Sequence, residues 1–208
     1  MRAIAANPNY PTAHQWYSEY LYAVGRFDDA IAEAKRAQEL DPLSVAISGS
    51  VAEAYYYARK YDQAIEADKQ TQIIDPKSVA THAGLARAYG QKKMYPEAVA
   101  ELQAVLQLNG NPTGASQIGE TFKSSGYQGV LQAFLDHILK DPDLSAHSYW
   151  IASLYAQLGK KNEALTWLEK AYTERSGGMV RLRSDPEFDS IRSEPGFVAI
   201  IRRMNFPD

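Results

Sequence analysis

The sequence of 208 residues contains no cysteine. Disulfides, a thiol nucleophile and a cysteine-ligated zinc are therefore excluded. Glycine and proline number only 13 and 10, which excludes a collagen-like or low-complexity chain. No apolar run approaches the ~18 residues of a membrane-spanning helix. The formal charge of −3 gives no general attraction to phosphate or anionic lipid, while 45% hydrophobic residues are enough for one globular body or a long solenoid.

An internal repeat with a period of 34 residues runs through the chain. Three classes of residue keep this spacing, namely Pro8, Pro42 and Pro76, then Ala30, Ala64 and Ala98, and finally Leu21, Tyr55 and Tyr89. The next alanine and tyrosine in register, Ala164 and Tyr155, follow after 66 residues, so one repeat is slightly contracted. The spacing predicts repeats over 11–44, 45–78, 79–112, a degenerate 113–144, and 145–176.

The residue pattern within each repeat predicts two helices joined by a tight turn. Tyr17, Leu21 and Val24 have helical spacing, and the pattern stops at Gly25, which can take the left-handed conformation that ends a helix. Asp–Pro pairs such as Asp41–Pro42 end the second helices. Small residues recur where the two helices must touch, at Ser18, Ala52, Ala86 and Ala152 in the first helix and at Ala30, Ala64, Ala98 and Ala164 in the second.

The two ends of the sequence depart from the repeat. Residues 1–10, with Ala3, Ile4, Asn7 and Pro8, fit the last turns of a helix whose partner would precede them, which leaves an uncapped face. Residues 177–208 predict a cap of two short helical segments that open at Asp185 and Ser193. Their apolar residues are expected to cover the last repeat, namely Phe188, Ile191, Phe197, Ile200, Ile201 and Met204.

The strings that carry a family resemblance lie in the first and fifth repeats. Residues 17–30 read YSEYLYAVGRFDDA, residues 151–164 read IASLYAQLGKKNEA, and the first repeat closes with AQELDP. The chain resembles the tetratricopeptide repeat (TPR) family over nearly its whole length. Departures are Arg59 and Lys93 where a turn glycine is usual, Gly110 where the closing proline is usual, and the whole fourth repeat.

The resemblance implies an all-α solenoid of antiparallel helix pairs that stack into a right-handed superhelix, with the C-terminal segments as capping helices. It thus implies a single domain over 1–208. The strings LTWLEKAYTERSG and LRSDPEFDSIRSEPGF are moreover similar to the C-terminal end of TPR arrays in bacterial multidomain regulators. That likeness favours a piece of a larger regulator, although no head domain is present from which an activity could be transferred.

No constellation of catalytic or metal-binding residues is found. The four histidines His14, His82, His137 and His147 include no pair at metal-ligand spacing, and neither H-E-x-x-H nor G-x-S-x-G occurs. His14 and His82 occupy the same repeat position, which favours a structural role. We therefore expect no enzyme, no metal and no cofactor.

Two further features invite a structural interpretation. Asp68 stands where repeats three and five place Leu102 and Leu168, at a position that normally packs inward. A buried unpaired carboxylate is costly, so Asp68 is expected to be exposed by a local helix shift or paired with a cation such as Lys69 or Arg59. The short basic groups, such as Lys92 with Lys93, are expected to lie in solvent-exposed turns.

In TPR proteins the first helices line the concave surface, and the register assigns many aromatic residues to it. The predicted partner-binding residues are Gln15, Trp16, Glu19, Tyr22, Ser50, Glu53, Tyr56, Tyr57, Arg87, Tyr149 and Trp150. Tyrosine and tryptophan give large contact area at low rotamer cost. A carboxylate clamp of the family is not expected, because its positions hold Gln15, Glu19, Ser50 and Ala80. Glu19 and Glu53 favour an apolar segment with some basic or amide character.

The predicted function is a non-catalytic protein–protein interaction scaffold that binds a peptide or protein segment in this aromatic groove. The alternative is a small-molecule or nucleic-acid binding module that uses the same surface. A membrane partner is not expected, nucleic acid is disfavoured, and self-association through the N-terminal face is a further expectation. Without a signal peptide in the first residues, the expected location is the cytoplasm.

Overall fold

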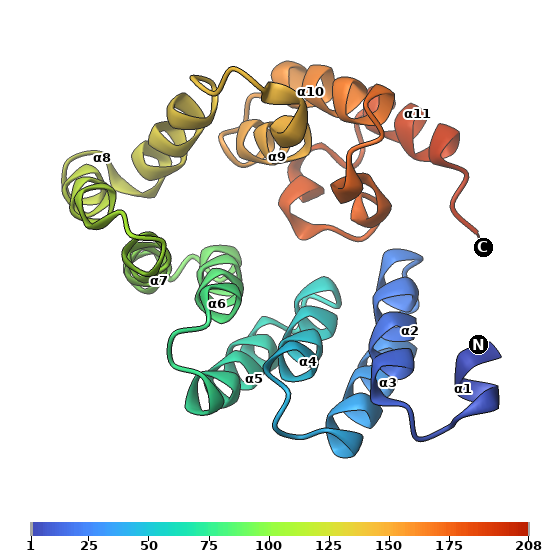
Figure 1. Ribbon diagram of the computed structural model, residues 1–208. Coiled ribbons are helices and arrows are strands. Elements are labelled where there is room, and N and C mark those ends of the chain that lie inside the picture. Colours follow the sequence, from blue (N-terminus) through green and yellow to red (C-terminus); the bar gives the residue numbers. More distant parts are fainter. Residues whose placement is uncertain (1, 208) are drawn as a thin grey trace. The chain divides into compact units, whose positions relative to one another are not determined.

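The computed structural model describes residues 2–207, and every regular element among them is helical (Figure 1). The chain divides into two compact units, unit 1 (Met1–Gly119) and unit 2 (Glu120–Asp208). Their boundary falls inside helix α8 (Pro112–Ile138), within the degenerate fourth repeat. The fold class predicted from the sequence, a solenoid of paired helices, is confirmed.

Unit 1 consists of a short helix followed by three helix pairs. α1 (Arg2–Ala6) packs against α2. The pairs are α2 (Pro11–Ala23) with α3 (Phe27–Leu40), α4 (Val45–Tyr57) with α5 (Tyr61–Ile74), and α6 (Val79–Gln91) with α7 (Tyr95–Leu108). α4 contacts both α2 and α6, so the first helices of the three pairs form one layer. Each second helix packs against its own first helix, and α3 and α5 also pack against the first helix of the next pair.

The small residues predicted at the helix contacts are buried as expected. Ala30 and Ala98 are completely buried, as is Ser18, whose hydroxyl donates to the Ala30 carbonyl at 2.7 Å across the first pair. Such close approach of two helix backbones is available only to small side chains. The 34-residue alanine spacing is therefore a packing signal.

Left-handed residues end the first helix of each pair. Gly25 has φ 89°, and Arg59 and Lys93 take the same conformation with φ 59° and 60°. A non-glycine residue there is strained by about 1 kcal/mol. The turn is nevertheless closed by the same backbone bonds, since Lys60 N donates to Tyr55 O as Arg26 N does to Leu21 O. The departures from glycine noted in the sequence thus leave the turn geometry unchanged.

Helix α8 is interrupted at Gly126, where φ is 65° and ψ is −167°. A glycine with positive φ thus interrupts the helix here, as Gly25 ends α2. The rest of unit 2 follows in the order η1 (Leu144–His147), α9 (Ser148–Gln157), α10 (Lys161–Thr173), η2 (Gly177–Arg181), η3 (Pro186–Ile191) and α11 (Pro195–Met204).

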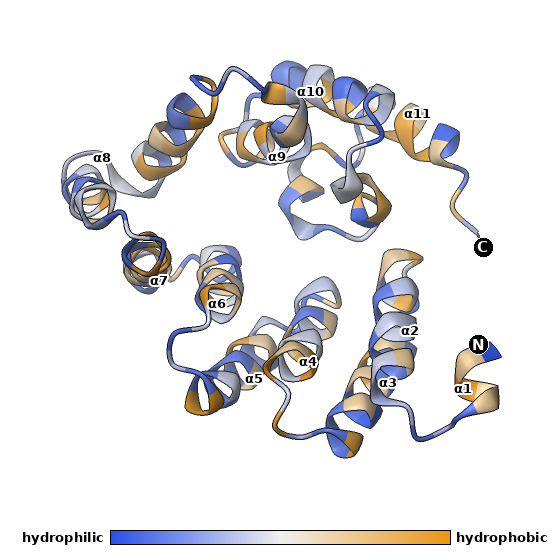
Figure 2. Ribbon diagram, in the orientation of Figure 1, coloured by the Kyte–Doolittle hydropathy of each residue, from blue (hydrophilic) through white to orange (hydrophobic). Residues whose placement is uncertain are grey.

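The C-terminal segments cover the α9–α10 pair, as predicted. Phe188, Ile191, Phe197 and Ile200 are buried in one cluster with α9 and α10, and Ile201 and Met204 pack against it. The hydropathy colouring of Figure 2 shows the apolar residues of α9, α10 and α11 within this unit. The predicted start at Ser193 is wrong, because α11 begins at Pro195, two residues later, where proline suits the first turn.

Candidate functional site

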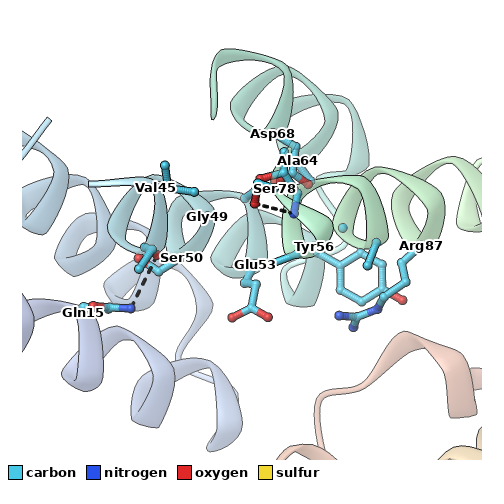
Figure 3. Close-up of a pocket in the computed structure, with 16 residues that line it drawn as sticks. Gln15, Val45, Gly49, Ser50, Glu53, Tyr56, Ala64, Asp68, Ser78 and Arg87 are labelled. Atoms are coloured by element: carbon cyan, nitrogen blue, oxygen red, sulfur yellow. Dashed lines mark hydrogen bonds between the residues drawn. The ribbon is translucent and has the colours of Figure 1, made fainter. Parts of the chain in front are cut away.

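A cavity of about 590 Å³ lies in unit 1 beside the layer formed by α2, α4 and α6. Its walls are largely small, with Gly49, Ala80 and Gly84 among the lining residues. Its polar groups come from all three helices of the layer and from α5 (Figure 3). Figure 3 labels those that matter most here, namely Gln15, Ser50, Glu53, Asp68 and Arg87.

Asp68 of α5 lines this cavity although its residue surface is only 4% exposed. Its carboxyl lies against Gly84 of α6, where an added Cβ would sit 2.5 Å from Oδ2. Within residues 2–207 the carboxyl makes no hydrogen bond or ion pair. The prediction that Asp68 is exposed or paired with Lys69 or Arg59 is therefore wrong. A glycine on the neighbouring helix makes the room in which the carboxyl is buried.

The surroundings of Asp68 favour its neutral form. Burial, together with the negative charges of Glu53 and Glu101, raises the pKa of Asp68 from an ordinary value of 3.8 to about 8, while Arg87 opposes the shift. Most Asp68 carboxyls are consequently protonated at pH 7. A cation that entered the cavity would reverse this balance.

An aromatic cluster forms one wall beside the cavity. The Arg87 guanidinium lies 4.2 Å from the centre of the Tyr56 ring, and Tyr57 stacks on Tyr22 at 4.3 Å. The Tyr22 hydroxyl reaches Glu53 Oε2 at 3.4 Å. The cluster therefore links α2, α4 and α6 through side chains that sequence analysis assigned to partner binding.

Five of the predicted partner-binding residues are buried in the structure rather than exposed on its surface. Tyr22 is 3% exposed and Tyr57 is fully buried, because their rings cover each other across the α2–α4 contact. Ser50 and Tyr56 are also buried, although both line the cavity edge. The fifth, Tyr149, is buried in unit 2.

The remaining predicted residues are accessible. Gln15, Glu53 and Arg87 line the cavity, and Glu19 is half-buried. Trp16 in unit 1 and Trp150 in unit 2 are each 64% exposed, and neither lines the cavity. The cavity thus brings together Gln15, Ser50, Glu53, Tyr56 and Arg87 from the predicted set.

Most of the cavity lining was not predicted from the sequence, and two of the residues outside the predicted set, Gly84 and Asp68, nevertheless left a signal. Gly84 occupies the repeat position that holds Trp16 in the first repeat and Trp150 in the fifth. A glycine where other repeats carry tryptophan indicates that space has been opened. Asp68 was recognised as unusual, but its contact with Gly84 crosses between two repeats and could not be read from spacing.

Tyr149 has a structural role in unit 2. Its hydroxyl donates to the buried carboxylate of Asp185 at 2.8 Å, and its ring meets Phe188 edge-on at 5.2 Å. A Cβ on Gly178 would lie 2.5 Å from the same ring, so glycine is needed there. Asp185 also accepts from Glu187 N at 3.1 Å and caps η3, as predicted.

The paired histidines are structural as well. His14 Nδ1 lies 2.6 Å from Glu33 Oε2 and its Nε2 lies 2.9 Å from the Pro8 carbonyl. His82 repeats this arrangement 68 residues later, with Glu101 at 2.5 Å and the Pro76 carbonyl at 3.2 Å. Each histidine ties a first helix to the loop before it and to the second helix. Across the described residues no cluster of three His, Asp or Glu could hold a metal ion.

Comparison with known proteins agrees with this architecture. Residues 2–45 and 148–176 match family models of the tetratricopeptide repeat. The chain therefore contains tetratricopeptide repeats in both of its compact units. Among solved structures, the crystal structure of YrrB, described as a TPR protein with an unusual peptide-binding site, is 21% identical and gives a TM-score of 0.50. The match covers 87% of this TPR protein and 94% of YrrB, and at this identity it supports the fold alone.

A search of curated proteins finds no match to this TPR protein. None of the helices formed by residues 2–207 is both long enough and apolar enough to cross a membrane.

Proposed function

We propose that the chain is a non-catalytic interaction scaffold that binds a peptide or protein segment in the cavity of unit 1. The observation that carries this proposal is the cavity itself. Its volume of about 590 Å³ lies within the range of ligand sites in proteins, and its small apolar walls are combined with a few polar groups.

The polar groups suit an extended peptide. Gln15 makes only a long contact of 3.5 Å to the Ala46 carbonyl, so its amide can exchange this bond for one with a bound main chain. The Glu53 carboxylate and the Arg87 guanidinium add an acceptor and a donor on the same side of the layer. A peptide carries both donors and acceptors along its length, which matches this mixture.

The other ligand classes find less support. Nucleic acid would bring phosphates toward Glu53 and Asp68, against only one lining cation, Arg87. Peptide binding is also described for YrrB, whose fold this chain shares. A cytoplasmic role as part of a larger bacterial regulator belongs to the same proposal and rests on the resemblance of residues 165–197 to the end of regulator arrays.

The proposal is tested by filling the cavity without damaging the helix. Gly49 lies inside α4 and lines the cavity, and a Cβ built there meets no atom within 4 Å. Gly49→Leu should therefore fold normally, with helix propensity raised by about 1 kcal/mol, and place its side chain in the cavity. Peptides selected on the wild-type protein from a random display library should bind the variant at least about tenfold more weakly by fluorescence anisotropy.

Ala100→Leu is the matched control, because Ala100 is exposed on α7 and does not line the cavity. It should bind the selected peptides as the wild type does. Equal affinity of Gly49→Leu and the wild type, or failure to select any peptide, would contradict the proposal.

A further inference from the structure

We infer that the cavity of unit 1 receives a basic side chain, lysine or arginine, of the bound segment, and that Asp68 is its counter-charge. This inference rests on the proposed function and adds the chemistry of the ligand. It concerns a carboxyl that no hydrogen bond or ion pair within residues 2–207 satisfies, although the residue is only 4% exposed and lines a cavity large enough for a guest.

Among residues 2–207, no donor or cation pairs with the Asp68 carboxyl. A buried carboxylate without a hydrogen bond or counter-ion is costly, and native structures rarely keep one without a reason. Leucine occupies the equivalent positions 102 and 168, so the fold itself does not require a carboxyl at this place. Gly84 leaves room for the carboxyl where a Cβ would displace it. An ammonium or guanidinium group in the cavity would supply the partner that the chain lacks.

Carboxylates outnumber cations around Asp68. The charged groups that face Asp68 are Glu53 from α4, Arg87 from α6 and Glu101 from α7. Glu101 is engaged by His82 at 2.5 Å, and Arg87 lies over the Tyr56 ring. Among the residues that line the cavity, Glu53 and an ionised Asp68 outnumber the single cation Arg87. A basic guest would neutralise the excess, whereas an acidic guest would increase it.

The cavity lining combines small apolar residues with charged ones. Ala46, Ala80, Ala83 and Gly49 line the same cavity as the carboxyl groups of Glu53 and Asp68. Lysine and arginine combine an apolar stem with a charged head, and they bury the stem along apolar walls. The cavity offers both environments.

Binding of a cation should release the proton of Asp68. Because burial and neighbouring carboxylates raise the pKa of Asp68 to about 8, the ionised fraction rises about tenfold between pH 7 and pH 9. A lysine side chain, with an ordinary pKa near 10.4, remains mostly charged over this range. Affinity for a basic guest should therefore increase by about the same factor.

The experiment uses small probes, so that it does not depend on a known peptide. N-acetyl-lysine methylamide, its arginine counterpart and the neutral N-acetyl-norleucine methylamide are titrated into the full chain while the NMR signals of labelled alanine methyl groups are followed. A basic probe should shift the Ala46, Ala80 and Ala83 signals saturably, at least about fivefold more tightly than norleucine and about tenfold more tightly at pH 9 than at pH 7.

Asp68→Asn keeps the shape of the side chain and removes its charge. The variant should lose the preference for basic probes by about fivefold or more, together with the rise in affinity with pH. Asp62→Asn is the matched control, since Asp62 is an exposed carboxylate on the same helix, α5, and pairs with Lys92. It should behave as the wild type does.

The outcomes separate this inference from the proposed function. Equal binding of basic and norleucine probes, or a pH dependence that Asp68→Asn leaves intact, would overturn the inference. Selected peptides that bind in the cavity without enrichment in lysine or arginine would also overturn it and leave the scaffold proposal standing. A basic probe that binds as expected while no peptide can be selected would instead contradict the proposed function.

Discussion

At the scale of single residues, Asp68 links stability to ligand chemistry. The equivalent Leu168 of α10 is completely buried and packs in the core of unit 2. In α5 the same position holds a carboxyl that the fold keeps neutral. A residue that lowers stability in the unbound protein and is located in a cavity is a functional candidate.

This cost gives a stability prediction for Asp68→Asn. The folded pKa of Asp68 is raised to about 8 from 3.8, so the unfolded chain loses its proton first and the wild type is progressively destabilised as pH rises between these values. Asparagine cannot ionise. The variant should match the wild type near pH 4 to within about 1 kcal/mol and exceed it by about 5 kcal/mol in free energy of unfolding at pH 8.

Urea unfolding at both pH values measures this difference. Asp62→Asn, the exposed control on α5, should show no such pH-dependent gain. A stability difference between Asp68→Asn and the wild type that stays constant from pH 4 to pH 8 would refute the raised pKa.

At the scale of helices, the alanine positions determine how closely the pairs pack. Ala98 of α7 is completely buried in the pair that α7 forms with α6. Ala98→Leu should overpack this contact and lower the free energy of unfolding by about 1–3 kcal/mol, as measured by thermal or urea unfolding. Ala100→Leu on the exposed side of the same helix should change it by less than about 0.5 kcal/mol. Wild-type stability in Ala98→Leu would refute the packing register.

The helix pairs could be predicted because their signals are local and periodic. Small residues, Asp–Pro pairs and left-handed turns recur at fixed spacing, and each acts within one repeat. The burial of the tyrosines could not be predicted in this way. The register places Tyr22 and Tyr57 on first helices, but their mutual stacking depends on the distance between α2 and α4, which the spacing within a repeat does not give.

The cavity could not be predicted either, because the spacing within a repeat does not describe contacts between repeats. It depends on glycines and alanines that fail to fill space between neighbouring repeats, and its central carboxyl meets Gly84 across two helices. The predicted partner-binding residues do lie on the layer of helices that borders the cavity, since Tyr56 and Arg87 line it. The small residues that create the space have no strong signal of their own.

At the scale of the whole molecule, an exposed apolar surface on α1 and α2 predicts self-association. Trp16 and Tyr20 are 64% and 49% exposed, and with Ile4 and Tyr17 they border a hollow of about 430 Å³. The small net charge of −3 provides little repulsion between copies. Contiguous exposed aromatic surface of this kind favours contact with another protein surface, and a second copy is always present at the same concentration.

The double variant Trp16→Ser with Tyr20→Ser should therefore shift the protein toward the monomer, because it removes the two largest exposed rings of this surface. Sedimentation equilibrium from micromolar to near-millimolar concentration measures this shift. Ile73→Ser is the matched control, since Ile73 is 74% exposed on α5 and lies outside the hollow. It should associate as the wild type does. A wild-type protein that remains monomeric at the highest concentration would refute the prediction, as would association that the double variant leaves unchanged.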